Sequence, residues 1–474
     1  MFTRALKTRR LALPLLALLA GCQAHMRGAA GVRPLADEAE VFVYLRPLPP
    51  EAERLSFEIA SLVAVSADGT EVPLQLRTRV VARARGERER LLAWGRVPPG
   101  RYTGLAVHVA KATLAGDEGP ANLIVPATPA EATLPFTAGR GTATVLSASI
   151  RYPASVEQTF QFEPSLLLAL PERTIPDNVA LCANAGQANV SLLDRRARRV
   201  TAVLPTGASP RAVAIDAAAR RAYVAVAEDD EVQVVDLASG ATLARVHLAP
   251  GDRPWDLALP AGGRSLVVAN SGSNTVSFVD LATLTEAQRV PTGDAPSTLL
   301  ADRAGRRAYV LDRRGNAITV VDLANRAVVA TVATDPEPLR AAIDAAGRRL
   351  YVVHAGSAYL TVLSLPDLAP AGRVFVGLGA TTVLVDSRTD LIYVGRGDAP
   401  RLDVYDPSSL APLTAVDLPA PASLLAIDDA ENVLWAVLPD ARAVAAVDLT
   451  SRELLATVDV GDAPAALALT GARP

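Results

Sequence analysis

Few residues of this 474-residue chain have the types and spacing that catalysis or metal binding requires. Asp229, Asp230 and Glu231 are consecutive carboxylates that could bind a divalent cation, but no histidine supports them. We therefore favour a solvated turn at this point. The sequence contains no CxxCH, CxxC, HExxH, GxSxG or phosphate-binding glycine loop. It predicts no catalytic group, no metal and no cofactor, and it favours a protein that is not an enzyme.

A second group of residues could bind a ligand, because these residues interrupt a repeated pattern. Trp255 occupies a position that is Arg211 or Ser297 in other copies of the pattern. An aromatic ring beside Arg253 could stack on a sugar or another ring, or it could only cap its own repeat. His354 is a single histidine, which is weak support for acid–base chemistry. The predicted ligand-binding residues are Arg253, Trp255, Arg313, His354, Tyr359 and Arg396.

The elements that must position these residues come from a repeat of about 42 residues. One position marks its phase, with successive steps of 42, 44, 42, 42, 42 and 42 residues: Asp194, Asp236, Asp280, Asp322, Ser364, Asp406 and Asp448. Each unit reads as four short strands, which cannot bury a core alone, so neighbouring units must stack. We therefore predict a seven-bladed β-propeller over residues 177–474. The first unit lacks its opening strand, which the segment from Pro464 should supply.

Strand order predicts where the candidate ligand-binding residues gather. The loops that precede the first strand of each unit and those that join its second and third strands must lie at one end of the ring. We call this end the loop face. All six candidate residues fall in or beside these loops.

The repeated segments YVAV, YVLD, YVVH and YVGR, each followed by a V-x-V-x-D strand, resemble the YVTN-type β-propeller family. The resemblance covers roughly residues 177–474. Local departures are Leu266 and Trp435 at the tyrosine position and Ser364 at the aspartate position. Lactonases, quinone-linked dehydrogenase subunits and surface-layer proteins resemble this class of repeat, so the resemblance implies several functions.

The start of the chain reads as an export signal. Four basic residues precede an apolar run that is too short to span a bilayer and ends in Leu19-Ala20-Gly21-Cys22. This tetrapeptide resembles the bacterial lipobox, which implies a signal peptide over residues 1–21, acylation of Cys22 and a tether over residues 22–37. Gln23 then implies the outer membrane. We expect a lipid-anchored envelope protein on the periplasmic face or the cell surface.

Charge and cysteine content restrict the partners. Removing residues 1–21 takes away four positive charges, so the net charge falls from -3 to -3 - 4 = -7, which argues against nucleic-acid binding. Cys182 is the second and last cysteine, and its apolar surroundings predict a buried free thiol. We expect a monomer.

Residues 38–170 are strand-rich but lie outside the repeat, and they predict an antiparallel β-sandwich. They resemble an uncharacterised sandwich domain of bacterial lipoproteins, through Val41 to Leu45, Asp68-Gly69, Pro99 to Leu105 and Pro135-Phe136. Six arginines cluster here and could contact anionic lipid headgroups or polysaccharide, although we favour a solvated sheet face: Arg77, Arg79, Arg83, Arg85, Arg88 and Arg90.

Three functions are consistent with this sequence. The first is an envelope lipoprotein whose propeller binds a protein, glycan or small ligand, and we favour it. The second is a periplasmic enzyme similar to lactonases or quinone-linked dehydrogenases. The third is a surface adhesion or surface-layer protein. A fold class cannot identify the ligand.

Overall fold

The computed structural model describes residue 35 and residues 37–83, 87–117, 119–157 and 161–470. These residues form strands β1 to β40, one single-turn α-helix, α1 (Tyr152–Ser155), and two 3-10 turns, η1 (Pro50–Ala52) and η2 (Pro176–Asn178). The predicted signal peptide, the acylation of Cys22 and nearly all of the tether lie outside the described residues. Within the described ranges, no helix is long and apolar enough to cross a bilayer.

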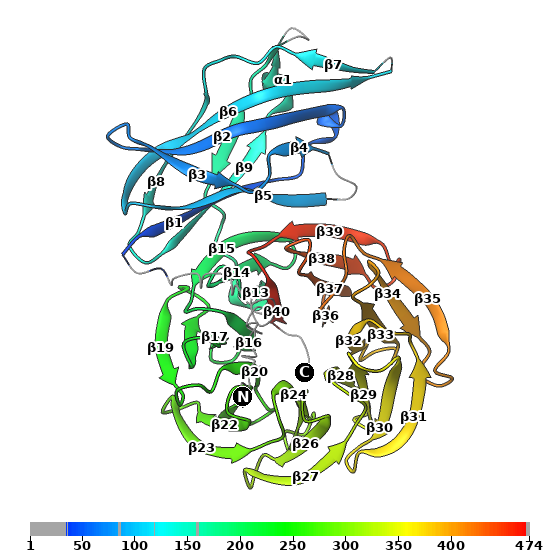
Figure 1. Cartoon of the computed structure of the whole chain (residues 1–474). Coiled ribbons are helices and arrows are strands. Elements are labelled where there is room, and N and C mark those ends of the chain that lie inside the picture. Colours follow the sequence, from blue (N-terminus) through cyan, green and yellow to red (C-terminus); the bar gives the residue numbers. More distant parts are fainter. Residues whose placement is uncertain (1–34, 36, 84–86, 118, 158–160, 471–474) are drawn as a thin grey trace, which may run out of the picture.

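The N-terminal domain contains the first twelve strands (Figure 1). They are β1 (Ala39–Leu45), β2 (Leu55–Ser66), β3 (Glu71–Leu76), β4 (Val80–Ala82), β5 (Glu87–Val97), β6 (Gly100–Gly116), β7 (Gly119–Leu123), β8 (Ala130–Ala138), β9 (Ala143–Ile150), β10 (Val156–Glu157), β11 (Gln161–Phe162) and β12 (Leu166–Ala169).

Two groups of strands enclose the core of this domain, and β3 pairs with both groups. One group contains β1, β5, β9 and β12, and the other contains β2, β4, β6, β7 and β8. Val43 from the first group and Phe57 from the second lie in the same buried cluster. The expected antiparallel arrangement is wrong where β1 pairs with β9 in parallel, and an isolated bridge between Ile124 and Gln161 is also parallel. Strands β1 and β9 are far apart in the sequence, so no hairpin constrains their relative direction.

Seven four-stranded blades form the propeller, as predicted (Figure 1). Blade 1 contains β40 (Pro464–Leu469), β13 (Val179–Asn184), β14 (Asn189–Asp194) and β15 (Arg199–Pro205). Blade 2 contains β16 (Pro210–Asp216), β17 (Arg221–Val226), β18 (Glu231–Asp236) and β19 (Thr242–His247). Blade 3 contains β20 (Pro254–Ala258), β21 (Ser265–Asn270), β22 (Thr275–Asp280) and β23 (Thr285–Pro291).

The remaining four blades follow in chain order around the ring. Blade 4 contains β24 (Pro296–Ala301), β25 (Arg307–Asp312), β26 (Ala317–Asp322) and β27 (Ala327–Ala333). Blade 5 contains β28 (Pro338–Ile343), β29 (Arg349–His354), β30 (Tyr359–Ser364) and β31 (Ala369–Phe375). Blade 6 contains β32 (Ala380–Val385), β33 (Ile392–Arg396), β34 (Arg401–Tyr405) and β35 (Pro412–Asp417). Blade 7 contains β36 (Leu424–Asp428), β37 (Val433–Leu438), β38 (Ala443–Asp448) and β39 (Leu454–Asp459).

The C-terminal strand closes the ring, which confirms the expectation from the incomplete first repeat. β40 pairs antiparallel with β13, so the two ends of the propeller share one sheet. The backbone N–H of Val179 also donates to Thr470 Oγ1 at 3.0 Å. Arg195 of blade 1 forms an ion pair of 2.6 Å with Asp428 of blade 7, and both side chains are almost fully buried. The first and last blades are therefore joined in two ways: the chain runs from blade 7 into β40 of blade 1, and side chains of the two blades contact each other.

The repeat has two physical causes. The tyrosines that begin the second strands, including Tyr223 and Tyr351, are fully buried, and Trp435 occupies the same position in blade 7. A large side chain at this position fills the space between stacked blades. The aspartate that ends the third strand caps the following turn: Asp448 Oδ1 accepts the backbone N–H groups of Thr450 and Ser451. Packing and turn capping therefore fix the residues that recur.

The two domains are joined by a continuous sheet and a shared core. Strand β5 of the N-terminal domain pairs in parallel with β39, which adds the N-terminal sheet to blade 7. Phe42 and Tyr44 pack in one buried cluster with Cys182 and Trp435 of the propeller. The predicted free thiol at Cys182 is therefore confirmed, and burial raises the pKa of that thiol far above its ordinary value. A shared core makes the domain arrangement part of the fold.

Candidate functional site

A β-bulge presents the Trp255 side chain at the loop face. In blades 2 to 6 the register between the first and second strands shifts at one residue near the start of the first strand, as between Pro254 and Asp256. A bulge leaves one residue unpaired and redirects its side chain. In blade 3 that residue is Trp255 and in blade 2 it is Arg211. The Arg211 guanidinium carbon lies 4.4 Å from the centre of the Trp255 ring.

The loop that leads into Trp255 is held rigidly. Asp230 accepts the backbone N–H groups of Gly251 and Arg253, both at 2.7 Å. Asp252 is buried and accepts two hydrogen bonds from Arg289, at 2.8 and 2.6 Å. Arg253 is exposed, and its backbone N–H is hydrogen-bonded to Asp230. Arg211, Trp255 and Arg253 form what we call the axial cluster.

A chain of polar side chains continues from this cluster around the ring axis, along the first strands of three blades. Asp256 of blade 3 accepts the backbone N–H of Leu299 of blade 4 at 2.9 Å. Arg340 of blade 5 lies 4.0 Å from Asp256 and 3.4 Å from the hydroxyl of Thr298. Burial raises the pKa of Asp256 even though Arg340 and two backbone N–H groups oppose that shift. The carboxyl therefore holds its proton more tightly than an ordinary aspartate.

His354 is buried beneath the loop face. Its Nε2 lies 2.9 Å from the Thr334 hydroxyl, and only 1% of the residue is exposed. Burial lowers the pKa of His354, which favours the neutral ring. The same position is Asn270 in blade 3 and Asp312 in blade 4, which also bond to side chains of their own blades. His354 therefore fills a recurrent buried polar position.

The other three predicted residues lie apart from the axial cluster. Tyr359 begins the third strand of blade 5 and contacts Arg373 and Phe375, with 4.4 Å between the Arg373 guanidinium and the ring centre. Arg313 lies 3.4 Å from Glu337. Arg396 forms two hydrogen bonds to Asp398 and two to backbone carbonyls, so its guanidinium is occupied in holding the loop between β31 and β32.

The acidic turn at residues 229–231 does not gather its carboxylates. Asp229 accepts the backbone N–H of Ala208, Asp230 holds the loop described above, and Glu231 is buried against Arg245. The described residues hold no group of three or more potential metal ligands. The three carboxylates therefore have separate structural roles.

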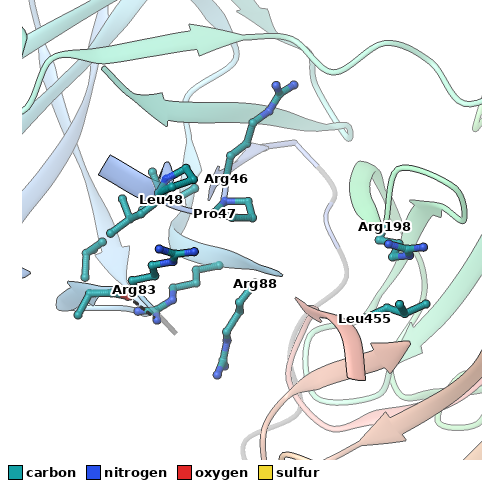
Figure 2. Close-up of a pocket in the computed structure, with 12 residues that line it drawn as sticks. Arg46, Pro47, Leu48, Arg83, Arg88, Arg198 and Leu455 are labelled. Carbon is teal, nitrogen blue, oxygen red and sulfur yellow. Dashed lines mark hydrogen bonds between the residues drawn. The ribbon is translucent and has the colours of Figure 1, made fainter. Parts of the chain in front are cut away.

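A cavity of about 500 Å³ lies between the two domains, at the end of the ring opposite the loop face (Figure 2). Arg198 lies on the turn between β14 and β15, and Leu455 lies on β39, so both come from the propeller. The facing wall comes from the N-terminal domain. Five arginines line this cavity: Arg46, Arg83, Arg88, Arg90 and Arg198.

The sequence could not reveal this cavity. The sequence groups Arg83, Arg88 and Arg90 in one cluster, but it does not connect Arg46 or Arg198 with that cluster. Arg46 meets the cluster because β1 pairs with β5, and Arg198 meets it because β5 pairs with β39. No local pattern predicts the pairing of β5 with β39. Strand order places Arg211 on the loop face with Trp255, but the contact between these two side chains of adjacent blades is not visible in the sequence.

The model of one protein family, described as "Lactonase, 7-bladed beta-propeller", matches residues 177–337, about one third of the chain. No curated protein matches the sequence.

Solved structures resemble this chain in fold. Hydrazine synthase of Kuenenia stuttgartiensis is 17% identical with a TM-score of 0.53, over 58% of this chain and 94% of that one. Dihydro-heme d1 dehydrogenase NirN, solved in complex with DHE, is 16% identical with a TM-score of 0.50, over 64% of this chain and 78% of that one. At such identities the likeness concerns the fold alone. The chain is thus a β-propeller protein with a lactonase-type family match in its first blades.

Proposed function

We propose that this protein binds a ligand rather than transforming one, and that the axial cluster at the loop face is its binding site. The observation that carries this proposal is the Arg211–Trp255 contact of 4.4 Å beside the exposed Arg253. An indole ring offers a stacking surface, and two guanidinium groups add positive charge. These features suit an acidic sugar or another anionic ring compound.

The rigidity of the cluster supports a binding role. Preorganised side chains lose little conformational freedom when a ligand binds, so more of the contact energy appears as affinity. Asp230 fixes the backbone of Arg253, and Arg211 already covers one face of the indole ring. The ligand would then contact the remaining exposed surface of Trp255 and the free guanidinium of Arg253.

Binding to an array of acidic and neutral oligosaccharides tests this function. We expect saturable binding of acidic members, and Trp255→Ala should weaken it by more than about tenfold, as loss of an aromatic anchor does. Phe375→Ala is a matched control, because Phe375 is an exposed aromatic residue at the same end of the propeller but on an outer strand. Equal binding by wild type and Trp255→Ala would remove the axial cluster as the site.

We also propose that the protein is anchored in the cell envelope through acylated Cys22 and acts there as a monomer. The lipobox-like sequence that ends at Cys22 supports this proposal. Multiple acyl chains bury many methylene groups and hold a protein stably at a membrane. Intact-mass measurement of the mature protein tests it: a protein that lacks lipid or begins at another residue would contradict the proposal.

A second candidate function is lactone hydrolysis, which the family match over residues 177–337 favours. Asp256 would be the acid–base group, and Arg340, 4.0 Å away, would stabilise the oxyanion. Asp256→Asn should then abolish hydrolysis of a lactone panel while the melting temperature stays within a few degrees of wild type. If the wild-type protein hydrolyses no lactone of the panel, the binding function stands alone.

A further inference from the structure

We propose that the cavity between the two domains binds a phosphate-bearing ligand, which arginines from both domains contact. This site is additional to the axial cluster. Arg198 lies on a turn between the third and fourth strands of blade 1, whereas the axial cluster lies where the first strands begin. The two sites are therefore at opposite ends of the propeller.

The cavity wall carries a large excess of positive charge. Four of its arginines come from the N-terminal domain and one from the propeller, and no carboxylate residue lines the cavity. Figure 2 shows Arg88 extending from the N-terminal domain, with Arg198 and Leu455 on the other side of the space. Arginines from two domains therefore line this one space.

Carboxylates outside the wall compensate two of the five charges. Arg83 lies 3.2 Å from Glu53, and both groups are partly exposed. Arg88 donates to Asp459 Oδ1 from two of its nitrogens, at 3.2 and 3.0 Å. These two ion pairs hold Arg83 and Arg88 in the cavity wall.

The remaining three arginines form no ion pair with any described residue. Arg90 donates to two backbone carbonyls at β4, at 3.4 and 2.8 Å. Arg46 donates from Nε to the Ser147 hydroxyl at 3.1 Å, which leaves its two terminal nitrogens without protein partners. Arg198 has no hydrogen bond or ion pair from its side chain within the described part of the chain. Neutral partners do not offset charge. Glu89, Asp459 and Asp448 act on Arg46, Arg90 and Arg198, respectively, only from beyond ion-pair distance, so they offset the positive charge in part.

The positive charge of this cavity wall is unfavourable in the absence of a bound anion. Burial, and then the neighbouring Arg88, lower the pKa of Arg90, while Asp459 opposes this shift. Like charges brought together in a partly buried space repel one another, and a bound anion would offset that repulsion. Arginine is also the residue that best matches phosphate, because its planar group can donate two parallel hydrogen bonds to two phosphate oxygens.

The size and lining of the cavity indicate an organic phosphate rather than inorganic phosphate alone. A volume of about 500 Å³ is typical of pockets for small organic ligands. Leu45, Leu48 and Leu455 form an apolar part of the wall beside the arginines. The phosphate would meet the guanidinium groups and the organic part would meet the leucines. A phospholipid headgroup and a soluble phosphate ester share this chemistry.

Calorimetric titration of the full chain with three probes tests this proposal: inorganic pyrophosphate, glycerol 3-phosphate and monomeric dihexanoyl phosphatidylglycerol. We expect saturable binding of at least one probe. Arg198→Gln and, separately, Arg46→Gln should weaken it by about tenfold or more, because each removes charge-assisted hydrogen bonds. Arg452→Gln is the matched control, since Arg452 occupies the equivalent turn of blade 7, with φ of 62° against 50° for Arg198, and does not line the cavity.

The relative affinities of the probes identify the source of the ligand. Tighter binding of the lipid than of glycerol 3-phosphate identifies a membrane lipid as the source, and equal binding identifies a soluble ester. Trp255→Ala should leave the affinity for all three probes unchanged. The proposal is overturned if no probe binds saturably, if Arg198→Gln and Arg46→Gln bind as wild type does, or if Arg452→Gln loses as much affinity as they do.

Discussion

At the scale of single residues, the buried carboxyl of Glu89 joins the two domains. It accepts the backbone N–H of Val200 in blade 1 at 2.7 Å. Burial raises the pKa of Glu89 to about 8, and Asp459 adds to this shift, whereas Val200, Arg199 and Arg46 oppose it. The folded protein therefore favours the protonated carboxyl at neutral pH. Proton binding at this residue is thus linked to the stability of the domain junction.

This linkage gives a pH-dependent prediction. An unfolded glutamate has a pKa near 4.5, so the folded chain keeps a proton that the unfolded chain releases between about pH 4.5 and 8. The stability that depends on this proton is complete below about pH 4.5 and is lost as the pH rises to about 8. Glu89→Gln has no charge to bury but still accepts from Val200. Its melting temperature relative to wild type should therefore increase steadily from pH 5 to pH 8.

Differential scanning fluorimetry at several pH values measures this difference directly. Other buried carboxyls, such as Asp312 with a pKa of about 6, also make the wild-type stability depend on pH, but they are present in both proteins. Subtracting the two melting curves isolates Glu89. A difference in melting temperature that stays constant from pH 5 to pH 8 would show that this carboxyl does not bind a proton as described.

At the scale of elements, the closing strand β40 completes blade 1. Without it, β13 would become an unpaired edge and its apolar side chains would be exposed. We expect that deleting residues 464–474 lowers the melting temperature by more than about 10 °C or causes aggregation. A chain that lacks only residues 471–474 keeps β40 and serves as the control. Equal melting of the two shortened chains would contradict closure by this strand.

The sequence predicted those elements whose side chains repeat. The aspartates that end the third strands and the tyrosines of the second strands recur because each blade uses the same turn and the same packing, so seven blades and their closure were visible. For His354, the sequence shows a departure from the repeat but not how deeply the side chain is buried. Only the structure reveals that this position is buried and polar in several blades.

At the scale of the whole molecule, the relation between the domains was not predictable. The parallel pairing of β5 with β39 joins segments separated by more than 350 residues, and the shared core contains side chains that each domain alone would expose. The arginine cavity exists only because of this junction. Long-range pairing of this kind leaves no periodic signal in either segment.

The anchoring of the molecule can be tested separately from its fold. Cys22→Ser removes the proposed acylation site, so the protein should move from the membrane fraction to the soluble fraction after cell lysis. Its melting temperature should not change, because residue 22 precedes the described domains. Fractionation followed by immunoblotting measures the distribution. Continued membrane association of Cys22→Ser at high salt would contradict lipid anchoring.

The central claim is that the axial cluster binds a ligand without transforming it, and isothermal titration calorimetry with an array-selected acidic oligosaccharide tests it most directly. Binding produces heat that saturates, whereas turnover produces heat that continues while substrate remains. We predict saturable heat with one site per chain, an affinity more than about tenfold weaker for Trp255→Ala, and wild-type affinity for Phe375→Ala. Continuous heat that disappears in Asp256→Asn, or equal affinity of Trp255→Ala and wild type, would contradict the claim.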